Sequence, residues 1–285
     1  MMVRKILSVL RYILVFMCLV FFLFPVYWLV ITAFKPSDEW FGWPPKFFPT
    51  KPTLSNFFGA KETEVFGGTT GSIENIFPYL RNSIIVGVSV ALISTAISAL
   101  AAYAIARYRV GGPFLAEWII SIRMLPPIVS AIPLYVIFTK LKLLNTWWAL
   151  ILSHLVIVVP LGVWLLISFF REIPREIDEA AYVDGATPFQ AFFYVVLPLS
   201  APGLAAVAIL SLIQSWGEFL LALVLTNDSR AQTLPIFLGR YITGWRVAWG
   251  PLSAAGIVTM LPVVIFAILM QRYLIRGLTF GAVKG

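Results

Sequence analysis

Residues 171–200 read REIPREIDEAAYVDGATPFQAFFYVVLPLS and form a polar segment between two long apolar runs. Arg171 and Arg175 lie in its first half among five of the chain's 13 acidic residues. A connection whose only task is to join two membrane helices can be far shorter and less charged. We therefore interpret the segment as a surface that a protein outside the bilayer binds. The five acids are Glu172, Glu176, Asp178, Glu179 and Asp184.

The first half of this segment predicts a short helix. Pro174 suits the first turn of a helix, because its missing N–H leaves no hydrogen bond unmade there. Carboxylates in the early turns interact well with the positive end of the helix dipole. Gly185 suits the left-handed position that ends a helix. We expect one face of this helix to contact the other protein, because its two alanines allow the backbone of that protein to approach closely. The face consists of Ile177, Ala180, Ala181 and Asp184.

A second short helix is predicted to follow a tight turn. Thr187 and Pro188 are typical of the N-cap and the first residue of a helix. We place this helix over residues 189–196 and expect Pro198 to stop it. The segment is thus predicted to be a helix–turn–helix that leads back into the membrane.

The composition is that of a membrane protein, with 60% hydrophobic and only 12% charged residues. A spanning helix needs about 20 mainly apolar residues, and six runs meet that requirement. The predicted fold class is therefore all-α, with six transmembrane helices and the helix–turn–helix between spans four and five. The six runs are residues 12–33, 82–106, 114–138, 146–170, 202–226 and 251–273.

Six positions at fixed spacing within the polar segment carry a resemblance to a known family. Glu179-Ala180-Ala181 is followed after three residues by Gly185, and after nine more by Val195, one residue and then Leu197-Pro198. This pattern resembles the EAA loop of binding-protein-dependent ABC importer permeases of the type I (MetI-like) fold. The chain departs from the pattern only in Val195, where the family has isoleucine. The residues 215–219 (SWGEF) and the tail 277–285 are similar to the smaller permease of maltose- and trehalose-type importers.

The resemblance implies a heteromeric complex. The EAA loop would dock on a separate ATPase subunit dimer that carries ATP and magnesium, a homologous second permease would complete the translocation pathway, and an extracytoplasmic solute-binding protein would deliver the solute. No cofactor or metal is expected on this chain. The implied coupling residues are Glu179, Ala180, Ala181, Asp184, Gly185, Val195, Leu197 and Pro198.

The resemblance also sets the expected orientation in the cell membrane, because basic residues are spread almost evenly over both sets of loops. The ATPase is cytoplasmic, so the EAA loop (171–200), the N-terminus (1–11) and the tail (274–285) are predicted to be cytoplasmic. Residues 34–81 would then form an extracytoplasmic loop after the first span (12–33), with residues 82–285 as the permease core. Anionic lipid headgroups account for the net charge of +8 without nucleic acid.

Polar residues within the predicted spans are candidates for lining the pathway, since ionisable groups in a membrane helix face protein or water. Arg123 could line the pathway or extend to the inner surface. His154 is expected to have a core or pore-lining role rather than a chemical one. Glu218 is the strongest candidate for a pathway or gating residue, with a hydrogen bond to a partner subunit as the alternative. Gln214 and Trp216 lie on the same predicted span.

The predicted function is a permease subunit that imports a sugar or oligosaccharide. The sequence contains no Gly-x-x-x-x-Gly-Lys-Ser/Thr phosphate loop, so we expect ATP hydrolysis on another chain. A polyol or a glycerol phosphate is the alternative solute. A stand-alone channel or secondary transporter would leave the acidic loop without a purpose. A membrane-embedded enzyme is disfavoured because Arg123, His154, Glu117 and Glu218 are scattered over the predicted spans.

Overall fold

The computed structural model describes residues 2–58, 76–242 and 247–279, and within these ranges the regular structure is helical. The chain divides into two compact units. Unit 1 comprises Met1–Ile76 and Leu238–Pro262, and unit 2 comprises Phe77–Phe237 and Val263–Gly285. The predicted all-α fold class is confirmed.

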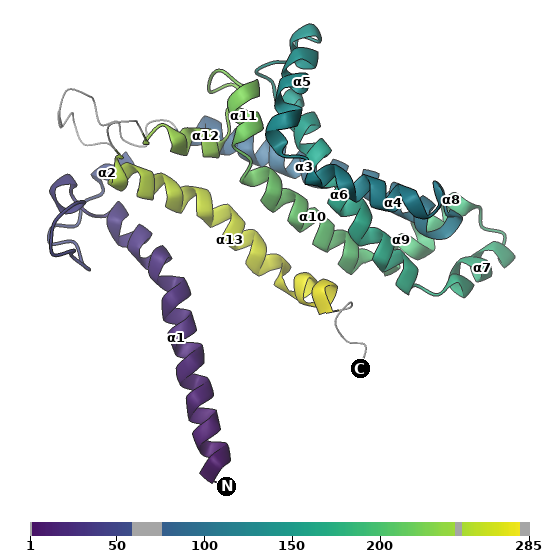
Figure 1. Ribbon diagram of the computed structural model, residues 1–285, viewed down its shortest axis with the longest axis horizontal. Coiled ribbons are helices and arrows are strands. Elements are labelled where there is room, and N and C mark those ends of the chain that lie inside the picture. The colour runs from purple at the N-terminus through teal and green to yellow at the C-terminus, as the bar shows by residue number, and fades with distance from the viewer. Residues whose placement is uncertain (1, 59–75, 243–246, 280–285) are drawn as a thin grey trace. The chain divides into compact units, whose positions relative to one another are not determined.

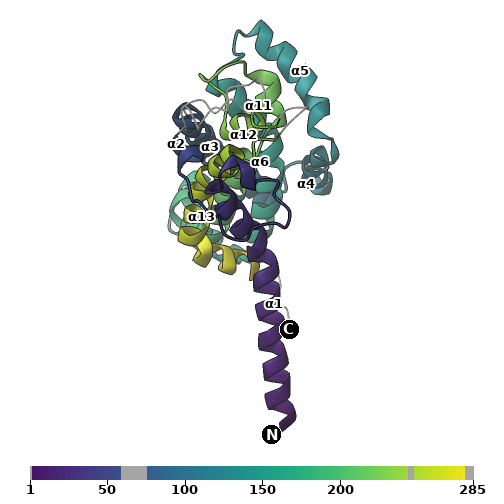
Figure 2. The ribbon, with the colours of Figure 1, turned by 90° about the vertical axis from the view of Figure 1, so that its left-hand side faces the viewer.

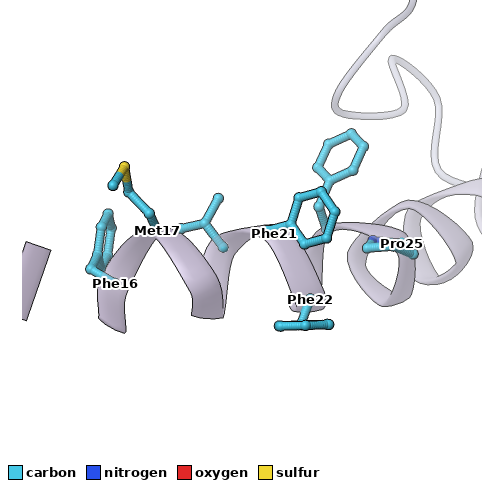
Figure 3. Close-up of a pocket in the computed structure, with 7 residues that line it drawn as sticks. Phe16, Met17, Phe21, Phe22 and Pro25 are labelled. Atoms are coloured by element: carbon cyan, nitrogen blue, oxygen red, sulfur yellow. The ribbon is translucent and has the colours of Figure 1, made fainter. Parts of the chain in front are cut away.

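Unit 1 begins with the long apolar helix α1 (Met2–Ala33), which Figure 1 shows as a single rod. Its spanning part, Leu7–Ala33, contains a strongly apolar stretch of 18 residues, and no residue of this stretch is buried against other parts of the chain. A hollow of about 530 Å³ lies along this helix, and all of its lining residues, among them Phe16, Phe21 and Pro25, belong to α1 (Figure 3). The hollow is therefore a gap between side chains of one helix and not a binding site.

A small lobe follows α1 and contains η1 (Ser37–Glu39) and α2 (Ser55–Phe58). The Lys35 side chain is 2% exposed, its Nζ lies 4.0 Å from the centre of the Trp28 ring, and burial lowers the pKa of Lys35. The Lys35 carbonyl accepts hydrogen bonds from Trp40 and Asn56. These contacts order the start of the connection that was predicted over residues 34–81; residues 59–75 of it lie outside the described part.

Unit 2 is built around three helices: α3 (Ile76–Tyr108), α6 (Trp147–Glu172) and α10 (Ala201–Trp216). They come closest at Gly162 of α6, where a Cβ atom would lie 2.4 Å from Ser98 Oγ of α3 and 3.0 Å from Val207 Cγ1 of α10. Small residues permit this close packing of helices in a membrane protein. Gly162 and Ser98 are the small residues that permit it here.

The predicted span 114–138 is not one straight helix. It consists of α4 (Gly112–Ser121), η2 (Ile122–Met124) and α5 (Pro127–Lys140), with a bend of 91° between the two halves (Figure 2). Leu125 and Pro126 at the bend have ψ angles of 128° and 136°. A residue before proline is pushed out of the helical region, so the consecutive prolines Pro126 and Pro127 break the helix here.

The predicted span 202–226 is also interrupted. Helix α10 ends at Trp216, and a new helix, α11 (Leu220–Leu225), begins three residues after Gly217. Beyond α11, the short helix α12 (Leu234–Gly239) precedes α13 (Trp249–Thr279). The predicted tail 274–285 therefore begins inside α13, and residues 280–285 lie outside the described part.

Within the part of the chain that the structure describes, four helices are long and apolar enough to cross a membrane, and the number rises to six if each of two bent pairs forms one span. The second bent pair is Pro188–Leu199 with Ala201–Trp216, at 78°. The six-span prediction agrees with the upper number. The boundaries differ most for the fifth span, because the bent pair runs from Pro188 to Trp216 whereas the prediction was residues 202–226. Helices α1 and α3 also start earlier than predicted, at Met2 instead of residue 12 and at Ile76 instead of residue 82.

Candidate coupling segment and polar residues of the spans

The predicted helix–turn–helix is present at residues 175–199. It consists of α7 (Arg175–Val183), α8 (Pro188–Ala191), η3 (Phe192–Val196), which is a π-helical turn, and α9 (Leu197–Leu199). Figure 1 shows α7 and α8 at the same end of unit 2. We call residues 175–199 the coupling segment.

The turn between α7 and α8 has the predicted geometry. Gly185 has φ +85°, in the left-handed region that glycine adopts without strain. Thr187 is the N-cap of α8: its Oγ1 accepts the backbone N–H of Gln190 at 3.3 Å, and Gln190 Oε1 accepts the backbone N–H of Thr187 at 2.8 Å. This reciprocal capping box fixes the direction in which the second helix leaves the turn.

The second helix differs from the prediction in its middle and at its end. Helix α8 gives way to the π-helical turn at Phe192, and Pro198 does not stop the helix. Pro198 instead lies in α9, which continues directly from the π-helical turn. The helix ends at Leu199, one residue beyond the proline.

The predicted binding face of α7 is wrong in one respect. Ala181 is 9% exposed and packs inside this chain, so its methyl group is not open to a partner. The exposed motif residues are Glu179, Ala180, Asp184, Gly185 and Pro198, whereas Val195 and Leu197 are half-buried. The sequence analysis did not single out the large apolar side chains that the segment presents to its surroundings: Val183, Phe189 and Tyr194 are 87%, 71% and 78% exposed.

Asp178, one of the five acids of the polar segment, is buried, at 5% exposure. Its Oδ1 accepts a hydrogen bond of 2.9 Å from the Tyr103 hydroxyl, and its Oδ2 lies 2.9 Å from Arg107 Nε in an ion pair. Arg107 Nη2 also donates to the Ile173 carbonyl at 2.9 Å, just before α7. We call Asp178, Arg107 and Tyr103 the inner clamp, because they join α7 to the end of α3.

Aromatic side chains surround the inner clamp. The Tyr103 ring lies 4.7 Å from that of Phe192 and 5.8 Å from that of Phe170, measured between ring centres. The hydroxyls of Tyr108 and Tyr182 lie 2.9 Å apart, which adds a second contact between α3 and α7. The coupling segment is therefore fixed to α3 as well as to α6, which directly precedes it.

His154, Ser215 and Glu218 lie together, although the sequence analysis described the polar residues as scattered. His154 Nδ1 is 2.8 Å from Ser215 Oγ, and His154 Nε2 is 3.4 Å from Glu218 Oε2. Glu218 lies in the break between α10 and α11, not inside a helix, and accepts the backbone N–H groups of Leu221 and Ala222. It thus begins α11 and ties it to α6.

This polar set is closed to a solute in the present conformation. His154 is 1% exposed and Ser215 5% exposed, and Trp216 beside them is 8% exposed. A nucleophile–histidine–carboxylate arrangement needs access to a substrate for any chemistry. The geometry therefore supports a structural role for His154 and Glu218, with the hydrogen-bond partner of Glu218 inside this chain.

Arg123 and Gln214 form a separate, accessible pair. Arg123 lies in η2 at the 91° bend, is exposed, and donates from Nη1 to Gln214 Oε1 at 2.9 Å. The same nitrogen lies 3.5 Å from the Ile157 carbonyl of α6. Of the five predicted pathway residues, His154 and Trp216 are thus buried, Glu218 and Gln214 are half-buried, and Arg123 is exposed.

We expect Glu218→Leu to destabilise the protein. The change leaves two backbone N–H groups of α11 and the His154 ring without their acceptor, and a buried unsatisfied group costs about 1–3 kcal/mol. The melting temperature in detergent should fall clearly, and Glu218→Gln, which keeps one acceptor oxygen, should give a smaller decrease. Glu117→Leu, at an exposed acid of α4, is the control. Equal melting temperatures for Glu218→Leu and the control would contradict this role.

Among the described residues, no group of three or more His, Cys, Asp or Glu side chains is arranged to hold a metal ion. The expectation that this chain carries no metal stays a prediction.

Comparison with known proteins identifies the family. The family model for the "binding-protein-dependent transport system inner membrane component" matches residues 94–280, which include the coupling segment. The chain belongs to this family of transport permeases and is a multi-pass membrane protein.

Relatives along almost the whole chain are permeases of ABC importers. The trehalose/maltose transport system permease of Thermococcus litoralis is 36% identical over 92% of this chain and 92% of its own length. The trehalose transport system permease of Mycobacterium tuberculosis is 37% identical over 92% and 93%. The sulfoquinovosyl glycerol transport system permease of Agrobacterium fabrum is 36% identical over 97% and 94%.

The fold is also that of a solved importer. A chain of a bacterial ABC transporter involved in the import of the acidic polysaccharide alginate superposes with a TM-score of 0.74 at 19% identity, covering 94% of this chain and 96% of its own. The same type of transporter in complex with an alginate pentasaccharide-bound periplasmic protein gives 0.60 at 16% identity, covering 94% and 93%. The MetI-like permease fold predicted from the sequence is confirmed.

Proposed function

We propose that the chain is one of two transmembrane permease subunits of an ATP-driven importer for a sugar or oligosaccharide. The observation that carries this proposal is the coupling segment, a helix–turn–helix that exposes large apolar side chains. The chain that contains it has sugar importer permeases as relatives. Disaccharides, a glycosylated glycerol and an alginate pentasaccharide occur in the names of the similar proteins. A polyol or glycerol phosphate remains the second candidate solute, favoured by the glycerol glycoside of one relative.

The coupling segment is proposed to dock on an ATPase subunit that carries ATP and magnesium. Val183, Phe189 and Tyr194 would fill an apolar cleft of that partner, and the exposed Glu179 carboxylate would face its polar rim. Fully buried aromatic side chains in a pocket dominate the binding energy of many interfaces. The segment and both termini would then be cytoplasmic, with residues 34–81 on the side from which a solute-binding protein delivers the solute.

Arg123 and Gln214 are the proposed contact with solute in the pathway. A guanidinium group and an amide supply the donors and acceptors that sugar hydroxyls require. Arg123 lies at the bend between α4 and α5, and Gln214 of α10 is hydrogen-bonded to it. His154, Ser215, Glu218 and Trp216 would support this region by fixing α6 against the break between α10 and α11. A homologous permease would supply the other half of the pathway.

The geometry indicates how ATP binding would open the pathway outward. Closure of the two ATPases would move α7 as a rigid body, because its turn and capping box leave it little freedom. Helix α6 ends at Glu172 immediately before α7, and α10 begins at Ala201 immediately after α9. Both helices would therefore tilt with the coupling segment.

The test is purification of the tagged chain in mild detergent and identification of the bound proteins. We expect an ATPase with a phosphate loop and a second permease, and uptake of radiolabelled maltose or trehalose by reconstituted complex with ATP. Phe189→Asp should reduce ATPase recovery about tenfold, as for loss of a buried aromatic anchor. Phe41→Asp, at a 69% exposed side chain of unit 1, should leave recovery unchanged. A chain that is purified alone and transports solute without ATP would refute the proposal.

A further inference from the structure

Helix α3 is held by buried polar groups at both of its ends. We propose that α3 is a rigid connection that carries motion of the coupling helix α7 to residues 229–234 at the other end of unit 2, through Asp178 and Arg107 at one end and Asn82 and Ser83 at the other. This inference rests on the proposed function, because it assumes that an ATPase moves α7.

The inner clamp is more than a surface contact. The Arg107 and Asp178 side chains are 6% and 8% exposed, Asp178 also accepts a hydrogen bond from the Tyr103 hydroxyl, and Arg107 also donates to the Ile173 carbonyl. Breaking one partner of a buried ion pair leaves an uncompensated charge, so the two groups separate only at a high cost. Helix α7 and the end of α3 are therefore expected to move together.

A second clamp lies at the start of α3. The Asn82 side chain is fully buried, and its Nδ2 donates to the carbonyls of Ser229 and Gln232, both at 2.9 Å. Its Oδ1 accepts from Trp147 Nε1 at 3.0 Å. Ser83 Oγ accepts the backbone N–H of Leu234 at 2.9 Å. We call these contacts of Asn82 and Ser83 with residues 229–234 the outer clamp.

The helix between the two clamps is continuous. It runs from Ile76 to Tyr108 without an internal proline break, which corresponds to a length of about 50 Å. Breaks interrupt the chain between α4 and α5, where two prolines lie, and between α10 and α11 at residues 217–219, so those segments can bend where α3 cannot. Among these helices, α3 is the one suited to transmit a displacement from one end to the other.

Through this connection, residues 229–234 would regulate the movement of α7 and so the activity of the ATPase. In the proposed orientation these residues are extracytoplasmic, on the side of the solute-binding protein. Movement of α7 would reach them through α3, and docking of the binding protein would act on α7 by the same path, since coupling between two sites is reciprocal.

The first test measures distances in the assembled wild-type complex. Spin labels are placed at Arg175 of α7 and Leu100 of α3, and in a control pair at Arg175 and Ile132 of α5, all exposed positions, after Cys18→Ser removes the native cysteine. On trapping with ATP and vanadate, the 175–132 distance should change and the 175–100 distance should not. A change in the 175–100 distance would overturn the inference. No change in either pair would count against the proposed function itself.

The second test distinguishes a role of the inner clamp in coupling from a role in protein stability. The double variant Asp178→Asn with Arg107→Gln leaves no unpaired buried charge, so assembly with the ATPase should be kept. Solute moved per ATP hydrolysed should fall about tenfold, because the interaction lost is one made during transport. Glu176→Gln, at an exposed acid of the same helix, is the control.

The outer clamp is tested by Asn82→Ala, which removes the hydrogen bonds of the Asn82 side chain to Ser229, Gln232 and Trp147, and the 3.4 Å bond that Asn82 accepts from Arg81. ATP hydrolysis without binding protein should stay near wild type, while stimulation of hydrolysis by the solute-loaded binding protein should be lost. Wild-type stimulation in Asn82→Ala, or a wild-type transport ratio in the Asp178 and Arg107 double variant, would overturn the inference. The distance measurement decides the matter if either variant does not assemble, because it needs no change in the clamps.

Discussion

Gly185→Val is expected to reduce solute uptake at least tenfold. Gly185 has φ +85°, and no described atom lies within 4 Å of where its Cβ would be, so the effect is conformational and not a clash. The left-handed conformation costs an ordinary L-residue roughly 1–2 kcal/mol, and a β-branched residue more. The turn should therefore rearrange, and α8 with its capping box should leave α7 in another direction. Uptake of radiolabelled sugar, normalised to the amount of complex in the membrane, is the measurement.

Gly185→Asn is the matched control for this prediction. Asparagine tolerates the left-handed region because its short side chain bonds to nearby backbone. The asparagine variant should retain most of the uptake, even though it too adds a side chain at this position. Similar uptake by the valine and asparagine variants would mean that the backbone conformation at Gly185 is not required for coupling.

Gly162→Leu is expected to prevent stable folding of unit 2. The added side chain would start 2.4 Å from Ser98 Oγ and 3.0 Å from Val207 Cγ1, where α3, α6 and α10 meet. Overpacking a dense interior typically costs about 1–3 kcal/mol, and a leucine at a three-helix contact should exceed this. The monodisperse fraction and the melting temperature in detergent are the measurements.

Two comparisons distinguish overpacking from a general intolerance of glycine substitution. Gly217→Ala should be tolerated, since the nearest atom to its Cβ is the Ile213 carbonyl oxygen at 3.7 Å. Gly162→Ala should destabilise, and Ser98→Gly should partly restore it by removing the atom closest to the new methyl group. Failure of Ser98→Gly to improve Gly162→Ala would contradict the packing argument.

Local signals made the coupling segment predictable. A left-handed glycine, an N-cap threonine and a proline at the first helical position act over a few residues, and Gly185, Thr187 and Pro188 lie where these rules place them. The spans were predictable for a similar reason, since hydropathy depends on composition and not on neighbours. The extent of the bend at Leu125 and Pro126 was not, because a proline can kink or break a helix.

The remaining features depend on contacts between distant residues. The helix dipole favours a carboxylate in the first turn of a helix, and this is a sufficient reason for an acid at position 178. The sequence therefore contained no signal that Asp178 would be buried against Arg107 and Tyr103. Likewise, the break before α11 contains no proline, and His154 lies 61 positions before its partner Ser215. Apolar residues in the coupling segment could have been noticed, since Val183, Phe189 and Tyr194 are large side chains in a segment that was predicted to meet a partner.

The π-helical turn at Phe192–Val196 affects how sequences of this kind are read. Such a turn contains about one residue more than an α-helical turn. A helical wheel drawn with a constant 3.6-residue period from Pro188 onward would therefore place Val195 and Leu197 on the wrong side of the helix. In an alignment, a relative with one residue fewer between the motif glycine and Leu-Pro would not have lost a coupling residue; its helix would have an ordinary turn there.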